Sequence, residues 1–328
     1  SAFVEKGGCR PIWSTEPVHR KVSGLSSFKA CTSLPSDIKE VVQMRRKTII
    51  TMVAVLLVLS FATISALATG YPVAIKDATG TEVIIKEEPR RIVSIVPSVT
   101  EMLYAVGLGD RLVGVTAWCT YPEEAKKVDK VGDVNINIEA VLAKKPDLVV
   151  ADTSMSGTTI SKIRELGVKV LAIKADDIAG MLDALKLLGM AGGKEAEADA
   201  LVASLSFRIE KVKAAIAKSK SRPSVFVEIW NEPLMTAGRG TYVDELIRLA
   251  GGRNIAEGVT GWPVFSQETV IKENPYLIIL TNYNKAEVLT RKAWSDLAAV
   301  RSGRVIEANP DLLVRSGPRL VDGLEELA

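Results

Sequence analysis

The chain has 328 residues, of which 47% are hydrophobic and 25% are charged, and its formal net charge is +3. This composition is that of a globular protein with enough apolar side chains for one large core or two smaller ones. The small net charge, together with the lack of a basic run interleaved with aromatic residues, argues against a nucleic-acid partner.

Cysteine and histidine are scarce in this sequence. The three cysteines are Cys9, Cys31 and Cys119, and the only histidine is His19. All of them except Cys119 precede an apolar segment that begins at Ile49. If that segment is cleaved off, the remaining chain cannot form an internal disulfide, a Ser-His-Asp triad, or a histidine-ligated zinc or haem site.

The apolar segment has the features of an export signal. Basic residues follow Met44, an almost unbroken apolar run covers 49–62, and Ala66-Leu67-Ala68 fits the A-x-A cleavage pattern. This order predicts a cleaved signal peptide over residues 44–68 and therefore a periplasmic or otherwise extracytoplasmic protein. The alternative is that the same segment is retained as a membrane anchor.

Residues 1–43 precede this signal and show no clear apolar period. A signal peptide normally begins a chain, so we interpret 1–43 as a leader that is non-native or untranslated. The alternative is a cytoplasmic extension before an anchor helix.

The first part of the exported chain alternates between strand-like and helix-like segments. Buried strands are predicted at 91–96, 112–116, 148–151 and 168–173, with helices between them. Ser98 and Glu101 have the spacing of a capping box, which predicts a helix that starts there and runs to about Val106. This βαβ order is typical of a parallel sheet covered by helices on both faces.

A long helix interrupts the alternation in the middle of the chain. Residues 194–220 contain no glycine or proline, and apolar residues recur at helical spacing from Leu201 to Ile216. After it the alternation resumes with segments at 224–229, 242–250, 268–273, 277–280 and 305–308, and a final helix from about Pro318. We therefore predict an N-terminal lobe at 69–193, a linking helix at 194–220 and a C-terminal lobe at 221–328.

The two predicted lobes also resemble each other in sequence. The segment 139–150 parallels 268–279, and both contain a proline seven residues after a glutamate, at Pro146 and Pro275. A helix that ends near Gly107 likewise parallels one that ends near Gly251. The fold class predicted is α/β, with two Rossmann-like lobes of parallel sheet joined by one long helix and a ligand cleft between them.

Tryptophans gather in the loops that follow the predicted strands. Trp118 follows 112–116, Trp230 follows 224–229, and Trp262 lies in a glycine-rich loop. Each of them could simply cover the core of its own lobe. Together they favour a cleft that stacks on a large planar or apolar ligand.

One short segment and one cysteine invite a catalytic interpretation. Trp230-Asn231-Glu232-Pro233 is similar to the acid/base segment of some retaining glycosidases, but no partner carboxylate stands out and a long helix interrupts the barrel rhythm. Cys119 has no histidine to activate it, so a buried small apolar role is expected. We predict that the protein has no catalytic residues and is not an enzyme.

From about Ile92 to its end, the chain resembles the cobalamin-type, helix-linked (class III) periplasmic solute-binding proteins of ABC importers, a family that also includes iron-siderophore and haem binders. The segments that carry this resemblance are 91–101, 121–123, 137–150, 261–268 and 311–319. The resemblance implies binding without catalysis, with cobalamin or another corrinoid as a transported ligand rather than a cofactor.

The resemblance also implies roles for individual residues. Trp118 and Trp262 match aromatic residues that face the corrin from opposite lobes, and Asp311 and Arg315 match polar ligand contacts in the last loop. We add Tyr121 and Trp230 as expected ligand contacts and expect no metal site.

On the same grounds, Glu139 and Glu268 match paired glutamates that dock on the permease. The expected partners are therefore an ABC permease dimer with its ATPase subunits and a small corrinoid, bound by a monomer.

The sequence also departs from this family. It lacks an aromatic residue that some cobalamin binders carry near Asp133 and Val134, and it lacks the disulfide that some of them carry. A ferric-siderophore or haem binder therefore remains an alternative, with Tyr121 or Tyr242 as a possible iron ligand. A glycosidase is the more distant alternative.

Overall fold

The computed structural model describes residues 70–328, together with Met52. The predicted leader at 1–43 and the predicted signal peptide at 44–68 lie outside this range, apart from Met52. Residues 70–328 lie within one compact unit. Over the part of the chain that the structure describes, no helix is both long and apolar enough to cross a bilayer.

The first sheet, which we call the N-terminal sheet, has four parallel strands in the order β4-β3-β5-β6. Its strands are β3 (Ile92–Ser94), β4 (Leu112–Gly114), β5 (Leu148–Asp152) and β6 (Val170–Ile173). The helices that connect them are α2 (Pro97–Ala105), η1 (Gly109–Arg111), η2 (Glu123–Lys127), α3 (Ile138–Ala143) and α4 (Thr153–Glu165). β5 and β6 are buried along their whole length, as expected for strands covered on both faces.

The second sheet, the C-terminal sheet, also has four parallel strands, in the order β10-β7-β11-β12. Its strands are β7 (Ser224–Glu228), β10 (Arg253–Asn254), β11 (Leu277–Leu280) and β12 (Val305–Glu307). The accompanying helices are α7 (Tyr242–Leu249), α8 (Gln267–Glu273), α9 (Lys285–Thr290), η3 (Lys292–Trp294), α10 (Ala298–Arg301), α11 (Pro310–Leu313) and α12 (Leu320–Leu327). Phe226 stacks on Phe265 and meets Trp294 edge-on in the core of this lobe.

Two short hairpins complete the fold. β1 (Val73–Lys76) and β2 (Glu82–Ile85) form an antiparallel pair before the N-terminal sheet. β8 (Trp230–Asn231) and β9 (Leu234–Met235) form another, directly after β7. The second hairpin therefore stands at the carboxyl end of a central strand.

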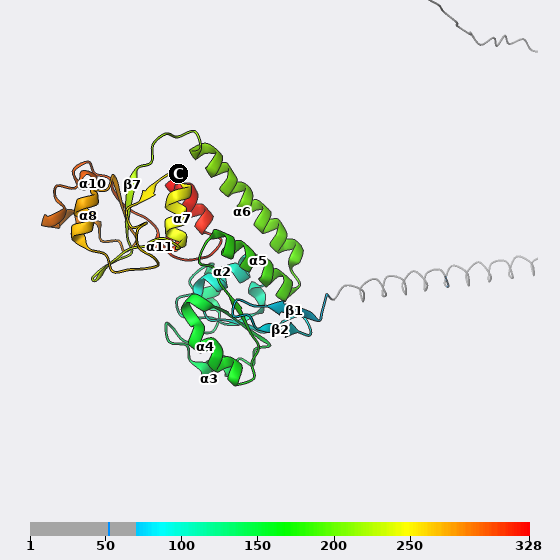
Figure 1. The fold of residues 1–328 in the computed structure, drawn as a ribbon. Helices are drawn as coiled ribbons and strands as arrows, with labels where there is room; N and C mark the ends of the chain where they lie inside the picture. The colour runs from blue at the N-terminus through cyan, green and yellow to red at the C-terminus, as the bar shows by residue number, and fades with distance from the viewer. Residues whose placement is uncertain (1–51, 53–69) are drawn as a thin grey trace, which may run out of the picture. The chain divides into compact units, whose positions relative to one another are not determined.

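A pair of helices joins the two sheets. α5 (Ile178–Gly192) packs against α6 (Glu195–Ile216), and α6 runs along one side of the unit from the lower lobe to the upper one (Figure 1). The buried residues of α6 are Ala198, Val202, Leu205, Ile209 and Val212. Four of these belong to the apolar stripe expected from the sequence, and α12 packs against both α6 and α7. The predicted fold class, with two parallel sheets linked by one long helix, is confirmed.

The start of α2 differs from the prediction. α2 begins at Pro97, with Val96 as its N-cap residue and no side-chain capping bond, so the expected capping box of Ser98 and Glu101 is wrong. Proline at the first helical position has no N–H that needs a partner, which makes a side-chain cap less necessary. Glu101 is instead buried and pairs with arginines far away in the sequence.

The two lobes repeat the same topology. Matching the sheet orders makes β3 equivalent to β7, β4 to β10, β5 to β11 and β6 to β12. Gly107 (φ 81°) and Gly251 (φ 83°) take the same left-handed conformation at the end of equivalent helices. Lys145 (φ 47°) and Asn274 (φ 42°) do so too, each directly before the proline of the sequence repeat. The internal repeat thus includes the unusual backbone conformation of individual residues at equivalent positions in the two lobes.

This repeat suggests a stabilising substitution. Lysine in the left-handed region is strained, whereas asparagine tolerates it. Lys145→Asn is therefore expected to raise the free energy of unfolding by about 0.5–1 kcal/mol, measured by urea unfolding. Lys145→Gln removes the same charge without easing the backbone, so an equal gain from glutamine would contradict this reasoning.

Candidate functional site

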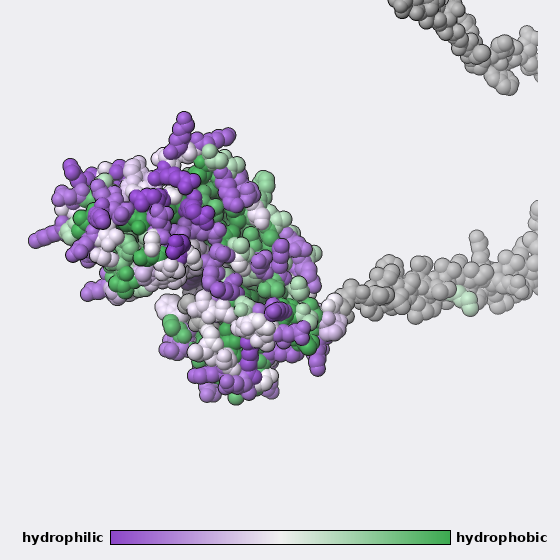
Figure 2. Space-filling model, in the orientation of Figure 1, coloured by the Kyte–Doolittle hydropathy of each residue, from purple (hydrophilic) through white to green (hydrophobic). Residues whose placement is uncertain are grey.

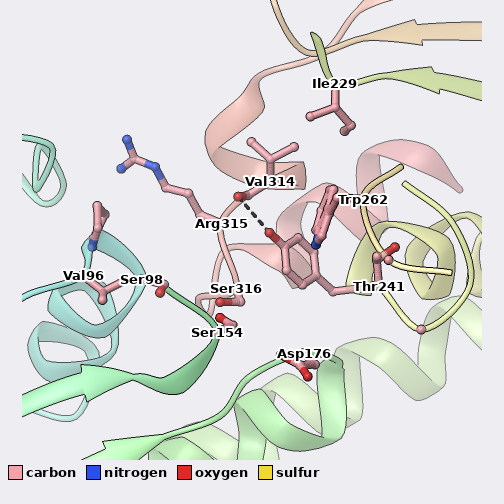
Figure 3. Close-up of a pocket in the computed structure, with 14 residues that line it drawn as sticks. Val96, Ser98, Ser154, Asp176, Ile229, Thr241, Trp262, Val314, Arg315 and Ser316 are labelled. Atoms are coloured by element: carbon pink, nitrogen blue, oxygen red, sulfur yellow. Dashed lines mark hydrogen bonds between the residues drawn. The ribbon is translucent and has the colours of Figure 1, made fainter. Parts of the chain in front are cut away.

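A cavity of about 650 Å³ lies between the two lobes (Figure 3). The N-terminal lobe contributes Val96, Pro97, Ser98, Ser154 and Asp176 to its lining. The C-terminal lobe contributes Ile229, Gly240, Thr241, Tyr242, Gly261, Trp262, Val314, Arg315 and Ser316. In Figure 2 the surface is indented between the lobes, on the side away from α6. The size falls within the range of about 300–1,000 Å³ that is usual for small-molecule sites.

The position of the cavity follows from the topology. Four lining residues lie one to three residues after the ends of β3, β5, β6 and β7, namely Val96, Ser154, Asp176 and Ile229. The carboxyl ends of both parallel sheets therefore face one space, which is where ligands bind in open α/β sheets.

Trp262 and Tyr242 form an aromatic wall on the C-terminal side. Their ring centroids are 5.3 Å apart, and the Tyr242 hydroxyl donates a 2.9 Å hydrogen bond to the Val314 carbonyl (Figure 3). Burial raises the pKa of the Tyr242 phenol far above its usual range, and the charges of Asp152 and Asp176 add to this. Tyr242 is thus held as a neutral phenol, and its hydroxyl hydrogen is engaged in the hydrogen bond to Val314.

The other aromatic residues predicted as ligand contacts lie outside the lining of this cavity. Trp118, in the loop after β4, is 57% exposed, and Trp230, in β8, is 54% exposed. The Trp230 indole donates to the carbonyl of Glu232 in its own hairpin. The Arg319 guanidinium lies over the Tyr121 ring, with its Cζ atom 3.9 Å from the ring centroid. Exposed aromatic side chains thus stand on both lobes, but of the four aromatic residues predicted as ligand contacts only Trp262 lies in the cavity wall.

Arg315 and Asp311 belong to a charge cluster that bridges the lobes. Arg315 lines the cavity and contacts Asp311 at 3.0 Å and Glu101 of α2 at 3.3 Å. Arg319 binds both oxygens of Glu101, at 2.7 and 2.9 Å, and approaches Asp311 at 3.4 Å. We call these four residues the interlobe cluster. Asp311 itself lies outside the lining.

Carboxylates also stand on the N-terminal side of the cavity. Asp176 lines it and pairs with Lys174 at 3.1 Å. Asp152, at the end of β5, is 1% exposed and caps α4 by accepting from the Ser154 backbone N–H at 2.8 Å. Its other oxygen, Oδ2, is buried without a hydrogen-bond partner. Sequence reasoning missed Asp152, Ser154 and Asp176, although each lies within three residues of the end of a predicted strand.

The two glutamates predicted to dock on a permease occupy equivalent places. Glu139 lies in the first turn of α3, capped by Asn137, and Glu268 lies in the first turn of α8, capped by Ser266. Both side chains are exposed, and neither forms an ion pair within the described residues. α3 precedes β5 and α8 precedes the equivalent β11, so each lobe presents one carboxylate at a matching position.

The catalytic interpretations gain no support from the geometry. Glu232 is exposed in the β8–β9 hairpin, outside the cavity lining, and the sheets do not form a barrel. Cys119 is 1% exposed, and its sulfur lies 3.1 Å from both the Thr100 and the Thr116 hydroxyls. Within residues 70–328, no group of three or more His, Cys, Asp or Glu side chains is placed to hold a metal ion.

Comparison with known proteins places the chain in a family. Residues 92–312 match the family described as "Periplasmic binding protein". The chain is 41% identical to an ABC transporter substrate-binding lipoprotein of Bacillus subtilis, YvrC, over 79% of this chain and 85% of that one.

Solved structures agree with this assignment. The vitamin B12-binding protein BtuF of Vibrio cholerae is 29% identical with a TM-score of 0.67, covering 73% of this chain and 95% of that one. The haem-binding protein RhuT of Roseiflexus is 26% identical, also with a TM-score of 0.67, covering 73% and 96%. These relatives are named as binding proteins rather than enzymes, and the chain belongs to the periplasmic binding protein family.

Proposed function

We propose that the protein is the extracytoplasmic substrate-binding component of an ABC importer and that it captures cobalamin or a related corrinoid. In this proposal the signal peptide at 44–68 is cleaved, and the released monomer delivers its ligand to a permease dimer with ATPase subunits. The family match and the similarity to a substrate-binding lipoprotein and a vitamin B12-binding protein support the general role.

The observation that carries the choice of ligand is the state of Tyr242. A haem binder normally supplies a side-chain ligand to iron, and tyrosine does so as the phenolate. The Tyr242 phenol is kept protonated by burial and by nearby carboxylates, and its proton is donated to Val314. The Tyr121 ring is covered by Arg319, and the only histidine is His19, ahead of the predicted cleavage site. A corrinoid carries its own lower base and needs no such ligand.

The aromatic residues suit a large ring-shaped cargo. We place the corrin against Trp262 and Tyr242 on the C-terminal side, with Trp118 and Tyr121 reaching it from the rim of the N-terminal lobe. Trp230 completes the rim of the C-terminal lobe, and Arg315 and Asp311 lie at the polar edge. Aromatic faces provide contact area at a low cost in side-chain entropy, which supports such a role.

Binding of cyanocobalamin by the purified exported chain, followed by calorimetry, tests this proposal. Trp262→Ala and Trp118→Ala are each expected to weaken affinity by about tenfold or more, because aromatic anchors at binding sites typically contribute over 1 kcal/mol. Phe207→Ala is the control, since Phe207 is an exposed aromatic residue on α6. Bound cobalamin should keep the base-on absorbance spectrum.

Haemin and a ferric siderophore serve as competing ligands in the same titration. Tight binding of either one, together with no binding of cyanocobalamin, would replace the corrinoid proposal. Unchanged cobalamin affinity in both tryptophan variants would move the site away from these side chains.

A further inference from the structure

The positive charge at the cavity is already neutralised by the protein. Among the described residues that line the cavity, Arg315 carries the only positive side chain. Its guanidinium contacts two carboxylates, Glu101 and Asp311, and is 19% exposed. A ligand that approached Arg315 would therefore meet a cation whose charge is compensated.

The interlobe cluster is balanced as a whole. It contains two arginines and two carboxylates, and Glu101 is its most buried member, with a side chain that is 2% exposed. Arg319 engages both oxygens of Glu101, while Arg315 reaches one of them. Glu101 thus orients both arginines although it does not line the cavity itself.

The opposite wall is acidic. Asp176 lines the cavity, and the buried Asp152 has one oxygen without a partner beside the cavity-lining Ser154. Lys174 is the one cation paired with Asp176 among the described contacts, and its side chain is 59% exposed. A ligand in this cleft therefore meets the Asp176 carboxylate on one side and the compensated Arg315 guanidinium on the other.

We propose that Glu101 is a specificity-determining residue: by neutralising Arg315 and Arg319 it makes the cleft select ligands whose side chains end in neutral amides and reject ligands whose side chains end in carboxylates. This inference rests on the proposed function and refines it, because the corrin side chains of cobalamin end in primary amides. Haem and carboxylate siderophores carry carboxylates instead. A carboxylate in this cleft lacks an uncompensated arginine and faces Asp176, and an unpaired charge in a partly desolvated site is costly.

The sharpest test uses ligands that differ only at one side chain. Cyanocobalamin is compared with its three monocarboxylic acids, in which one corrin amide has been hydrolysed to a carboxylate of nearly the same shape. The wild-type protein is expected to bind at least one of these acids about tenfold more weakly than cyanocobalamin. Glu101→Gln leaves Arg315 and Arg319 with a single counter-charge, so the same acid should regain most of that loss while cyanocobalamin changes little.

A second variant guards against misfolding. Asp311 has a side chain that is 31% exposed, so Asp311→Asn removes a counter-charge with less disturbance of the interior than Glu101→Gln. It should shift the acid-to-amide affinity ratio in the same direction by a smaller factor. Glu210→Gln is the charge control, because Glu210 is an exposed residue of α6 paired with Lys213. The proposal is overturned if Glu101→Gln and Asp311→Asn both fold and the acid-to-amide affinity ratio equals that of the wild type for all three acids.

Failure of the proposed function would give a different result. If the wild type ignores cyanocobalamin and binds haemin, the corrinoid assignment is lost. The charge rule is then tested with haemin and its dimethyl ester, which lacks the two carboxylates. Preference for the ester in the wild type, and its reversal in Glu101→Gln, would support the rule, whereas preference for the diacid in the wild type would overturn it.

Discussion

Glu228→Ala is expected to lower the free energy of unfolding by about 3–5 kcal/mol, because it removes the fully buried carboxylate that neutralises Arg291 and leaves only the exposed Glu287 as its counter-charge. Glu228 ends β7 and is fully buried. The Arg291 guanidinium binds both of its oxygens, at 2.6 and 3.0 Å, and the Asn284 amide donates to it at 2.6 Å. Arg291 also lies over the Trp294 ring in the core of this lobe. Urea unfolding followed by circular dichroism measures the effect.

The same arginine provides the matched control. Glu287 pairs with Arg291 at 2.5 Å, but its side chain is 51% exposed. Glu287→Ala should therefore cost no more than about 1 kcal/mol, since exposed ion pairs contribute little. Replacing both partners by methionine should recover much of the stability lost in Glu228→Ala. If Glu228→Ala and Glu287→Ala cost the same, the buried pair does not have the importance we assign to it.

Replacing Glu139 and Glu268 together by alanine is expected to reduce ligand transport by at least tenfold while cobalamin affinity stays unchanged. We propose that these carboxylates bind arginines on the permease, one contact per lobe. A partner built on a two-fold axis needs matching contacts on both lobes, and the two glutamates occupy equivalent helix starts. Hydrogen-bonded charge pairs at interfaces contribute about 1.5–3 kcal/mol each, enough for such a loss.

An ordinary structural role predicts a different outcome. An acidic residue in the first turn of a helix stabilises that helix by about 0.3–1 kcal/mol through the helix dipole. Under that explanation the double variant would transport normally and only melt slightly earlier. Glu87→Ala combined with Glu210→Ala removes two exposed carboxylates elsewhere and controls for total charge. Uptake of labelled cobalamin and pull-down with the permease distinguish the two explanations.

Much of the fold could be predicted because it depends on local pattern. The β-branched runs at 148–151 and 277–280 became the central strands β5 and β11, since their side chains must be covered on both faces. The glycine-free stretch after Lys194 became α6, and its apolar stripe is the buried side of that helix. The repeated glutamate-to-proline spacing indicated two similar lobes because it marks the same helix and the same turn in each.

Sequence position indicates which loops lie near the site, but it does not show which side chains in those loops point into the cavity. Trp262 and Arg315 line the cavity, whereas Trp118 and Trp230 stand exposed outside its wall. Trp230 belongs to the β8–β9 hairpin, where its side chain is exposed, and a two-residue strand leaves little trace in the sequence. Asp152 and Asp176 were missed since a lone aspartate after a strand is as common in a helix cap as in a binding site.

By itself, the sequence determined that there are two parallel sheets, that the two lobes repeat the same order of elements, and that one long helix lies between them. These features depend on hydrophobic periodicity and turn residues, which are local properties of the chain. Only the tertiary structure decided the role of Glu101. Its spacing from Ser98 suggested a local cap, but the interlobe contact brings it to Arg315 and Arg319, 214 and 218 residues away. Such pairings depend on how two lobes meet, and no local pattern encodes the identity of a partner across that interface.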